Sequence, residues 1–226
     1  ARLKTFDDPY NPFMIICAHA GHRTGEDGPT HADPQPLQLL QENFPGNSLI
    51  TLTPWDTQEI WPMLIAALKA RPAVIVPFVT RPSEKVVDRE KLGFPVASSA
   101  AKGVYALRKA DPKAGQYNGT LVLQGNAVGH IFATEVIEEL DNIGFNMNVY
   151  YIASAELFNL LPDEEKNSIY PESLAQEAMG ITEFTFPTLY RWVVSREGRK
   201  KSLHAFSRGE FSGSGQADKV LEEAGL

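Results

Sequence analysis

Short apolar runs alternate with amphipathic stretches along most of the chain. The runs end at Pro, Gly or charged residues and predict buried strands at 13–18, 48–52, 73–79, 120–124 and 148–152. Between them, apolar residues spaced three or four positions apart predict helices, the clearest at 127–143, where Gly144 is a usual helix stop. Strands that alternate with helices are typical of an α/β protein with parallel sheets.

A second helix is predicted after Pro54. Asp56 or Thr57 can cap it, and Glu59 falls in its first turn. The apolar residues at 61, 64, 65 and 68 recur at helical spacing.

The pattern divides into two units. The stretch 83–91 is rich in charge and predicts a solvated connection, and 103–108 predicts an edge strand. The turn at 111–115 suits a domain boundary. We therefore expect two three-layer α/β units with mostly parallel sheets, at 1–112 and 113–226, the first one incomplete at its N-terminus.

Composition excludes several functions. The 226 residues include 21 Lys plus Arg against 28 Asp plus Glu, a net charge of −7, which gives no attraction to nucleic acid or anionic membranes. No apolar run approaches the roughly 18 residues of a transmembrane helix. The single cysteine, Cys17, lies in an apolar run and predicts a buried, inert thiol in a reducing compartment, so we expect a cytoplasmic protein.

The segment 17–31 holds three of the five histidines, together with acidic and glycine residues. Taken from the residues alone, His19, His22 and His31 could be metal ligands together with Asp27 and Asp33, or one or two of the histidines could be satisfied by backbone carbonyls in a polar loop. Their spacing matches no common metal signature, so no metal site is predicted.

The order of residues is more informative. Gly-Glu-Asp-Gly-Pro-Thr-His at 25–31 resembles a motif of the transketolase family, and His19 precedes it at the end of a strand as in that family. The stretches 53–59, 75–81, 121–128 and 211–220 are similar to further transketolase segments. The chain resembles the end of the pyrimidine-binding domain plus the C-terminal domain of a transketolase.

The resemblance implies transfer of a two-carbon ketol unit between ketose and aldose phosphates with thiamine diphosphate, in the pentose phosphate pathway. It implies a catalytic role for His31 beside the reacting carbon and a substrate-hydroxyl contact for Asp27. His19 and Arg81 correspond to residues that meet the sugar phosphate.

The segments that hold the cofactor in the family have no counterpart here. The resemblance therefore implies that thiamine diphosphate and Mg²⁺ are bound only in the complete enzyme, and that the chain alone is inactive. It implies a missing N-terminal domain or partner subunit, and a homodimer by analogy. We also expect the sheet containing 13–18 to have an exposed or swapped edge unless another chain covers it.

Two alternatives stay open. One is another thiamine-diphosphate enzyme, such as a deoxyxylulose-phosphate synthase or a pyruvate dehydrogenase component. The other is a non-catalytic module that binds an anion or a protein through the turn at Gly125–Asn126. Ala20, His22 and Arg23 depart from the family pattern, so the sugar pair is not predicted.

Overall fold

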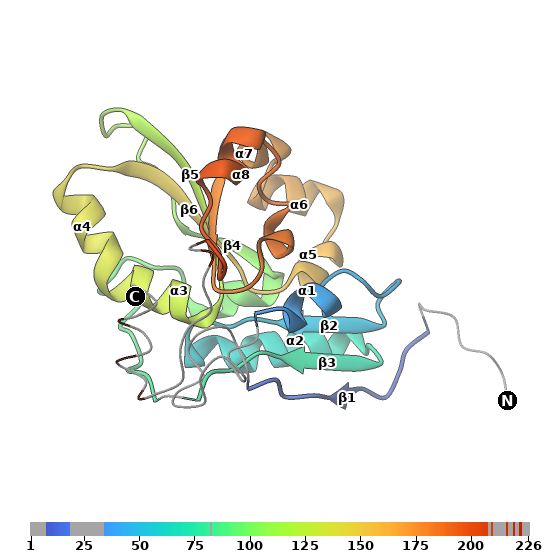
Figure 1. Cartoon of the computed structure of the whole chain (residues 1–226). Helices are drawn as coiled ribbons and strands as arrows, with labels where there is room; N and C mark the ends of the chain where they lie inside the picture. Colours follow the sequence, from blue (N-terminus) through green and yellow to red (C-terminus); the bar gives the residue numbers. More distant parts are fainter. Residues whose placement is uncertain are drawn as a thin grey trace, which may run out of the picture.

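The computed structural model describes residues 8–18, 34–81 and 83–207, with the single residues 209, 216, 219 and 222. Its strands form two sheets, each with helices on both faces (Figure 1). The strands are β1 (Phe13–Met14), β2 (Leu49–Leu52), β3 (Val74–Pro77), β4 (Val104–Arg108), β5 (Tyr117–Gln124), β6 (Asn146–Ile152) and β7 (Met179–Thr182).

Short helices make up most of the remaining regular structure. The α-helices are α1 (Pro36–Leu40), α2 (Ile60–Ala70), α3 (Asn126–Ile131), α4 (Ile137–Asn142), α5 (Ala155–Asn159), α6 (Asp163–Ile169), α7 (Glu172–Glu177) and α8 (Arg196–Lys201). The 3-10 helices are η2 (Thr57–Glu59), η3 (Ala97–Lys102) and η5 (Phe186–Leu189), and a π-helical turn, η4 (Phe132–Val136), joins α3 to α4.

The first sheet is parallel, in the order β1-β3-β2. Alternate residues of its strands face opposite sides. Ile50 and Ile75 pack with Met63 of α2 on one face, and Val76 packs with Leu37 of α1 on the other. This arrangement gives three layers, helix, sheet and helix.

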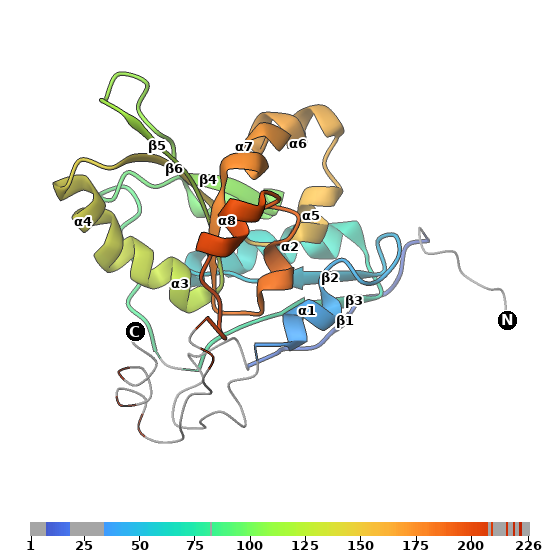
Figure 2. The same ribbon diagram turned by 45° about the horizontal axis from the view of Figure 1, so that its top comes forward.

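The second sheet has the order β4-β6-β5-β7, with β4 antiparallel and the other three strands parallel. Leu123 and its neighbours on one face pack with Phe132 of η4, and Val122 on the other face belongs to the cluster formed with the α5–α8 side (Figure 2). The expected fold class, two three-layer α/β units with mostly parallel sheets, is confirmed.

The strand β4 lies in the second sheet, although the sequence expectation placed 103–108 in the first unit. The sheets therefore divide between β3 and β4. One apolar cluster also joins them, because Ile50 and Ile75 of the first sheet and Leu121 of the second belong to it. The domain boundary at 112/113 stays a prediction.

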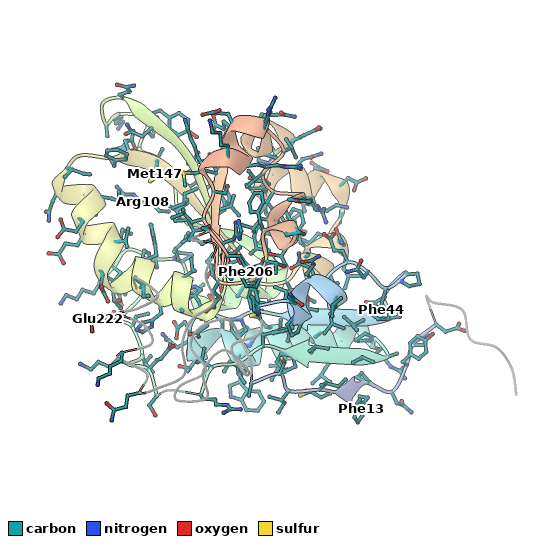
Figure 3. The ribbon with its side chains drawn as sticks, viewed as in Figure 1. Phe13, Phe44, Arg108, Met147, Phe206 and Glu222 are labelled. Carbon is teal, nitrogen blue, oxygen red and sulfur yellow. The ribbon has the colours of Figure 1, made fainter. Side chains whose placement is uncertain are left out.

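The strand β1 is not buried as predicted. Only β3 pairs with it among the described residues, so it forms the edge of the first sheet. Phe13 is 66% exposed and lies on the outer rim of the molecule (Figure 3), and Ile16 is equally exposed. Cys17 is partly exposed, which corrects the expected buried thiol. The expectation of an exposed edge is confirmed for the part of the chain that the structure describes.

The helix predicted after Pro54 is present as η2 followed by α2, and Asp56 caps it by accepting a hydrogen bond from the Gln58 amide. Its core-facing residues include Met63 and Ala67, which are fully buried. Trp61, one of the apolar residues at helical spacing, is 72% exposed. The apolar pattern was therefore broader than the face that packs on the sheet.

The helical stretch from α3 to α4 packs against the first unit through Gly129. A Cβ on Gly129 would lie 2.4 Å from Trp55 Cβ and 2.6 Å from Trp55 Cγ. Gly129→Ala is therefore expected to lower the free energy of unfolding by about 1–3 kcal/mol through overpacking, although Ala is the better helix former. Urea unfolding measures the change. Gly115→Ala, where no atom lies within 4 Å of the new Cβ, is the control and should be near neutral.

Candidate functional site

The carboxyl ends of β1 and β3 lie side by side. The Cys17 amide donates to the Pro77 carbonyl and the Val79 amide donates to the Cys17 carbonyl, both at 2.9 Å. The pairing therefore continues past both strands. Arg81 follows two residues after Val79 and is exposed. The segment that contains the motif at 25–31 therefore begins at the carboxyl end of β1, next to the carboxyl end of β3, after which Arg81 follows.

Three of the four predicted site residues, His19, Asp27 and His31, lie outside the described residues. The chain is described again from Pro34, whose carbonyl accepts a hydrogen bond from the Thr185 amide at 3.3 Å. Thr185 follows β7 of the second sheet. The described residues on either side of 19–33 thus contact β3 at one end, through Cys17, and the stretch after β7 at the other, through Pro34.

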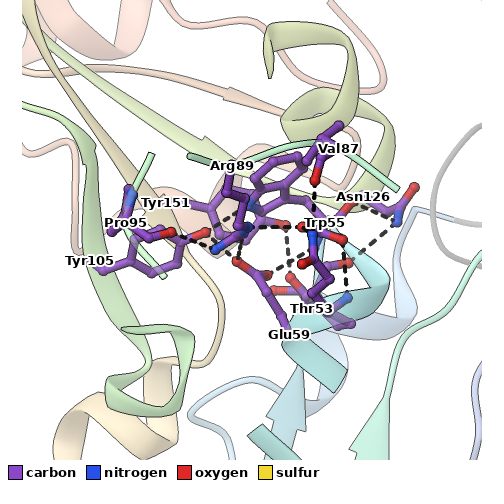
Figure 4. A network of polar contacts seen from close by, with 12 residues as sticks. Thr53, Trp55, Glu59, Val87, Arg89, Pro95, Tyr105, Asn126 and Tyr151 are labelled. Carbon is purple, nitrogen blue, oxygen red and sulfur yellow. Dashed lines mark hydrogen bonds and ion pairs between the residues drawn. The ribbon is translucent and has the colours of Figure 1, made fainter. Parts of the chain in front are cut away.

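A cluster of buried charges occupies the start of the η2–α2 helical stretch (Figure 4). Arg89 Nε lies 2.9 Å from Asp56 Oδ2, and Arg89 Nη2 lies 2.5 Å from Glu59 Oε1. The three side chains are 6%, 2% and 0% exposed, in the order Arg89, Asp56, Glu59. One guanidinium thus serves two carboxylates away from solvent.

Two aromatic residues extend this cluster into the second sheet. Tyr105 of β4 donates its hydroxyl hydrogen to Glu59 Oε1, and Trp55 Nε1 donates to the Tyr105 hydroxyl at 2.6 Å. The Arg89 guanidinium lies 4.8 Å from the centre of the Trp55 ring. Burial raises the pKa of the Glu59 carboxyl to about 7, against the opposing effects of the Arg89 charge and of these hydrogen bonds.

The connection after β3 is held in place at several points. Gln58 Nε2 donates to the Val87 carbonyl at 3.0 Å, and Arg89 Nη1 donates to the Pro95 carbonyl at 3.0 Å. The Glu84 carboxylate lies 3.8 Å from His130 Nδ1 of α3. The predicted solvated connection at 83–91 is therefore confirmed for most of its residues, which are exposed, and corrected for Arg89, which is buried with its two carboxylate partners.

The turn at Gly125–Asn126 does present backbone amides, as an anion site requires. Gly125 has a φ of +110°, which favours glycine. The Ala127 amide, however, donates to Glu183 Oε1 at 3.0 Å. A carboxylate of the chain itself thus takes the position that an external anion would use, which disfavours the anion-binding alternative.

In the described ranges, no three His, Cys, Asp or Glu side chains converge as metal ligands. Nor does any helix within these ranges have the length and apolar character needed to cross a membrane. The part of the chain that the structure describes therefore offers no such side-chain cluster for the Mg²⁺ that the resemblance implies.

Curated proteins similar to this chain are transketolases. The match to transketolase of Aquifex aeolicus is 25% identical over 221 residues, covering 93% of this chain and 30% of that protein. The match to chloroplastic transketolase of Spinacia oleracea is 27% identical over 217 residues, covering 94% and 26%. The chain resembles the C-terminal part of transketolases. No family model matches it.

Solved transketolase structures share the fold. Transketolase from Leishmania mexicana superposes with a TM-score of 0.68 at 18% identity over 92% of this chain and 27% of that one. The Campylobacter jejuni enzyme gives 0.62 at 24% identity, over 95% and 29%. The chain thus spans less than a third of the length of the transketolases that it matches.

Sequence reasoning missed the buried charge cluster. Asp56 and Glu59 are recognisable as a helix cap and a first-turn acid, and that role explains both without a partner. Arg89 lies in a run of charged residues that favours solvent. The signal that could have found the cluster is the number of acidic residues at the start of the helix. Where the first turn is buried, a second carboxylate beside the capping one needs a nearby cation.

Proposed function

We propose that this chain is the C-terminal portion of a transketolase-type enzyme, which transfers a two-carbon ketol unit between a ketose phosphate and an aldose phosphate. The observation that carries the proposal is the unbroken string Gly25–His31 in a segment that begins at the sheet edge beside Arg81. The similarity to transketolases over more than nine-tenths of the chain supports it.

In this proposal, Arg81 and His19 hold the phosphate of the sugar. A guanidinium offers a planar fork of donors that suits two phosphate oxygens. Asp27 accepts a hydrogen bond from a sugar hydroxyl and so distinguishes its stereochemistry. His31 hydrogen-bonds the oxygen at the reacting carbon and exchanges a proton with it near neutral pH.

The complete enzyme also needs thiamine diphosphate and Mg²⁺, which are not assigned to any described residue of this chain. Thiamine diphosphate, when bound with Mg²⁺, supplies the electron sink for the ketol carbanion. We propose that a further N-terminal domain or a partner subunit holds both, and that the assembled enzyme is a homodimer in the cytoplasm. The chain alone is then expected to be inactive.

An assay of the chain with and without its cofactor-binding part tests the proposal. The encoding reading frame shows whether the cofactor-binding part belongs to the same polypeptide or must be supplied as a separate subunit, and native mass spectrometry of a mixture establishes whether separate subunits associate. With thiamine diphosphate, Mg²⁺, a ketose phosphate and an aldose phosphate, the chain alone should give no transfer and the complex should give transfer. A complex that forms but transfers no ketol unit would contradict the proposal.

The Arg81 prediction separates phosphate recognition from catalysis. Arg81→Ala in the assembled enzyme is expected to raise KM for a phosphorylated ketose about 10- to 100-fold, since a charge-assisted hydrogen bond contributes about 1.5–3 kcal/mol. Steady-state kinetics with a phosphorylated and a non-phosphorylated ketose measure it, and Arg81→Lys should recover part of the loss. An equal rise of KM for both ketoses would show that Arg81 does not read the phosphate.

A further inference from the structure

The buried charge cluster joins three parts of the chain. Asp56 and Glu59 belong to the η2 turn of the first unit, Arg89 to the connection after β3, and Tyr105 to β4 of the second sheet. Trp55 lies between these parts, because its indole N–H donates to Tyr105 and its ring stacks near Arg89. The cluster is thus placed at the junction of the two sheets.

The charges of this cluster do not balance. A guanidinium keeps its proton in proteins, so Arg89 contributes one positive charge and the two carboxylates contribute two negative charges when both are ionised. Burial leaves the excess negative charge without water. The cluster becomes neutral if one carboxyl binds a proton.

The hydrogen bonds indicate which carboxyl takes the proton. Asp56 Oδ2 accepts from Arg89 Nε and from Gln58 Nε2, each at 2.9 Å, and Asp56 Oδ1 accepts from the Gln58 amide at 3.0 Å. On Glu59, Oε1 accepts from Arg89 and Tyr105, whereas Oε2 accepts only a long 3.3 Å bond from the Trp55 amide. Oε2 of Glu59 is therefore the oxygen with room for a proton.

The other groups that face Glu59 do not titrate in the neutral range. Burial, followed by the Glu59 charge, raises the pKa of Tyr105 well above its usual value. Burial and the same charge also raise the pKa of Tyr151 on β6, whose hydroxyl donates to the Thr53 carbonyl at 2.7 Å. Arg89, Tyr105 and Tyr151 thus keep their protons while Glu59 changes state.

We propose that Asp56, Glu59, Arg89 and Tyr105 form a buried proton-binding latch at the junction of the two sheets, in which Glu59 binds one proton. This site does not depend on the proposed function. The proton neutralises the cluster, so the junction is more stable when Glu59 is protonated. The latch therefore makes the contact between the units weaken as pH rises.

The sign follows from linkage. Burial raises the pKa of Glu59 in the folded chain from 4.5 to about 7, so the folded state holds more protons than the unfolded state between these values. The latch then favours folding most at pH below 4.5, loses that contribution as pH rises to about 7, and changes little above. Glu156, another buried acid whose pKa burial raises, contributes in the same direction.

The Trp55 indole provides a direct readout of this proton. The chain has three tryptophans, and Trp61 is 72% exposed and serves as an internal control. With ¹⁵N-labelled tryptophan, the indole N–H resonance of Trp55 is expected to shift with a midpoint near pH 7, because its hydrogen-bond acceptor Tyr105 is bonded to Glu59. The Trp61 resonance should stay constant.

Two variants complete the test. Glu59→Gln should abolish the pH titration of the Trp55 resonance. As pH rises from about 5 to 8, the denaturation midpoint of this variant should also fall less than that of the unchanged chain. The contribution of Glu156 to the pH dependence is the same in both proteins and cancels in the comparison. Asp56→Asn leaves one carboxylate for Arg89, so it should move the pH midpoint of the Trp55 titration well below 7. A Trp55 resonance that does not titrate in the unchanged chain, or one that still titrates in Glu59→Gln, overturns the proposal.

Discussion

His31→Ala is expected to lower kcat of the assembled enzyme for ketol transfer by about 10²- to 10⁴-fold, the usual contribution of a positioned proton-transfer group. KM for the sugar phosphate should change much less, because Arg81 and His19 still hold the phosphate in the proposed site. The reason lies in the role of the imidazole, which bonds to the oxygen where charge develops and exchanges its proton near neutral pH.

Steady-state kinetics over a range of pH measure this effect. His31→Gln keeps a hydrogen-bond donor and loses proton exchange, so it should recover only a small part of kcat. An unchanged denaturation midpoint in both variants would show that folding is intact. A rise in KM with no fall in kcat would place His31 in substrate binding alone and contradict the assigned role.

Arg89→Met should lower the free energy of unfolding by about 3–5 kcal/mol, which is a large part of the 5–15 kcal/mol typical of a domain. The variant leaves Asp56 and Glu59 buried without their cation, and both side chains are almost inaccessible to water. Since Arg89 also donates to the Pro95 carbonyl, the connection after β3 loses an attachment.

Equilibrium urea unfolding of the chain measures the loss. Arg196→Met is the matched control, because Arg196 is exposed, and it should change stability by less than about 1 kcal/mol. The triple variant Asp56→Asn, Glu59→Gln, Arg89→Met removes all three charges and should be more stable than Arg89→Met alone. A cost below about 1 kcal/mol for Arg89→Met would show that the cluster does not hold the junction.

Local patterns predicted the elements whose burial is uniform. The strand predicted at 48–52 is β2, with all four of its residues buried, and the helix predicted at 127–143 spans α3 to α4 and ends at Gly144 with a φ of +72°. In both cases, the same residues set the local structure and the packing.

Patterns failed where burial depends on distant parts of the chain. The run at 13–18 has the composition of an inner strand, but β1 has one paired neighbour among the described residues and its apolar side chains are exposed. Arg89 shows the opposite error. Its charged neighbours in the sequence predict exposure to solvent, but it is buried because it pairs with two carboxylates that lie 30 and 33 positions earlier. A local hydropathy pattern does not report contacts between residues that are so far apart in the sequence.

The candidate site was predicted by the order of residues rather than by their periodicity. The string Gly25–His31 implied roles for Asp27 and His31, and these stay predictions because both residues lie outside the described ranges. The structure adds that Arg81 and the chain before His19 leave neighbouring strand ends. The comparisons add the transketolase resemblance over nearly the whole chain.

Transfer of a labelled two-carbon unit tests the central claim most directly. The complex of this chain with its cofactor-binding part is supplied with thiamine diphosphate, Mg²⁺, an unlabelled aldose phosphate and a ketose phosphate that carries ¹³C at carbons 1 and 2. Mass spectrometry of the new ketose phosphate should find both labelled carbons together, and His31→Ala should suppress that product. A complex whose new ketose phosphate carries no label, or that forms none, would contradict the account.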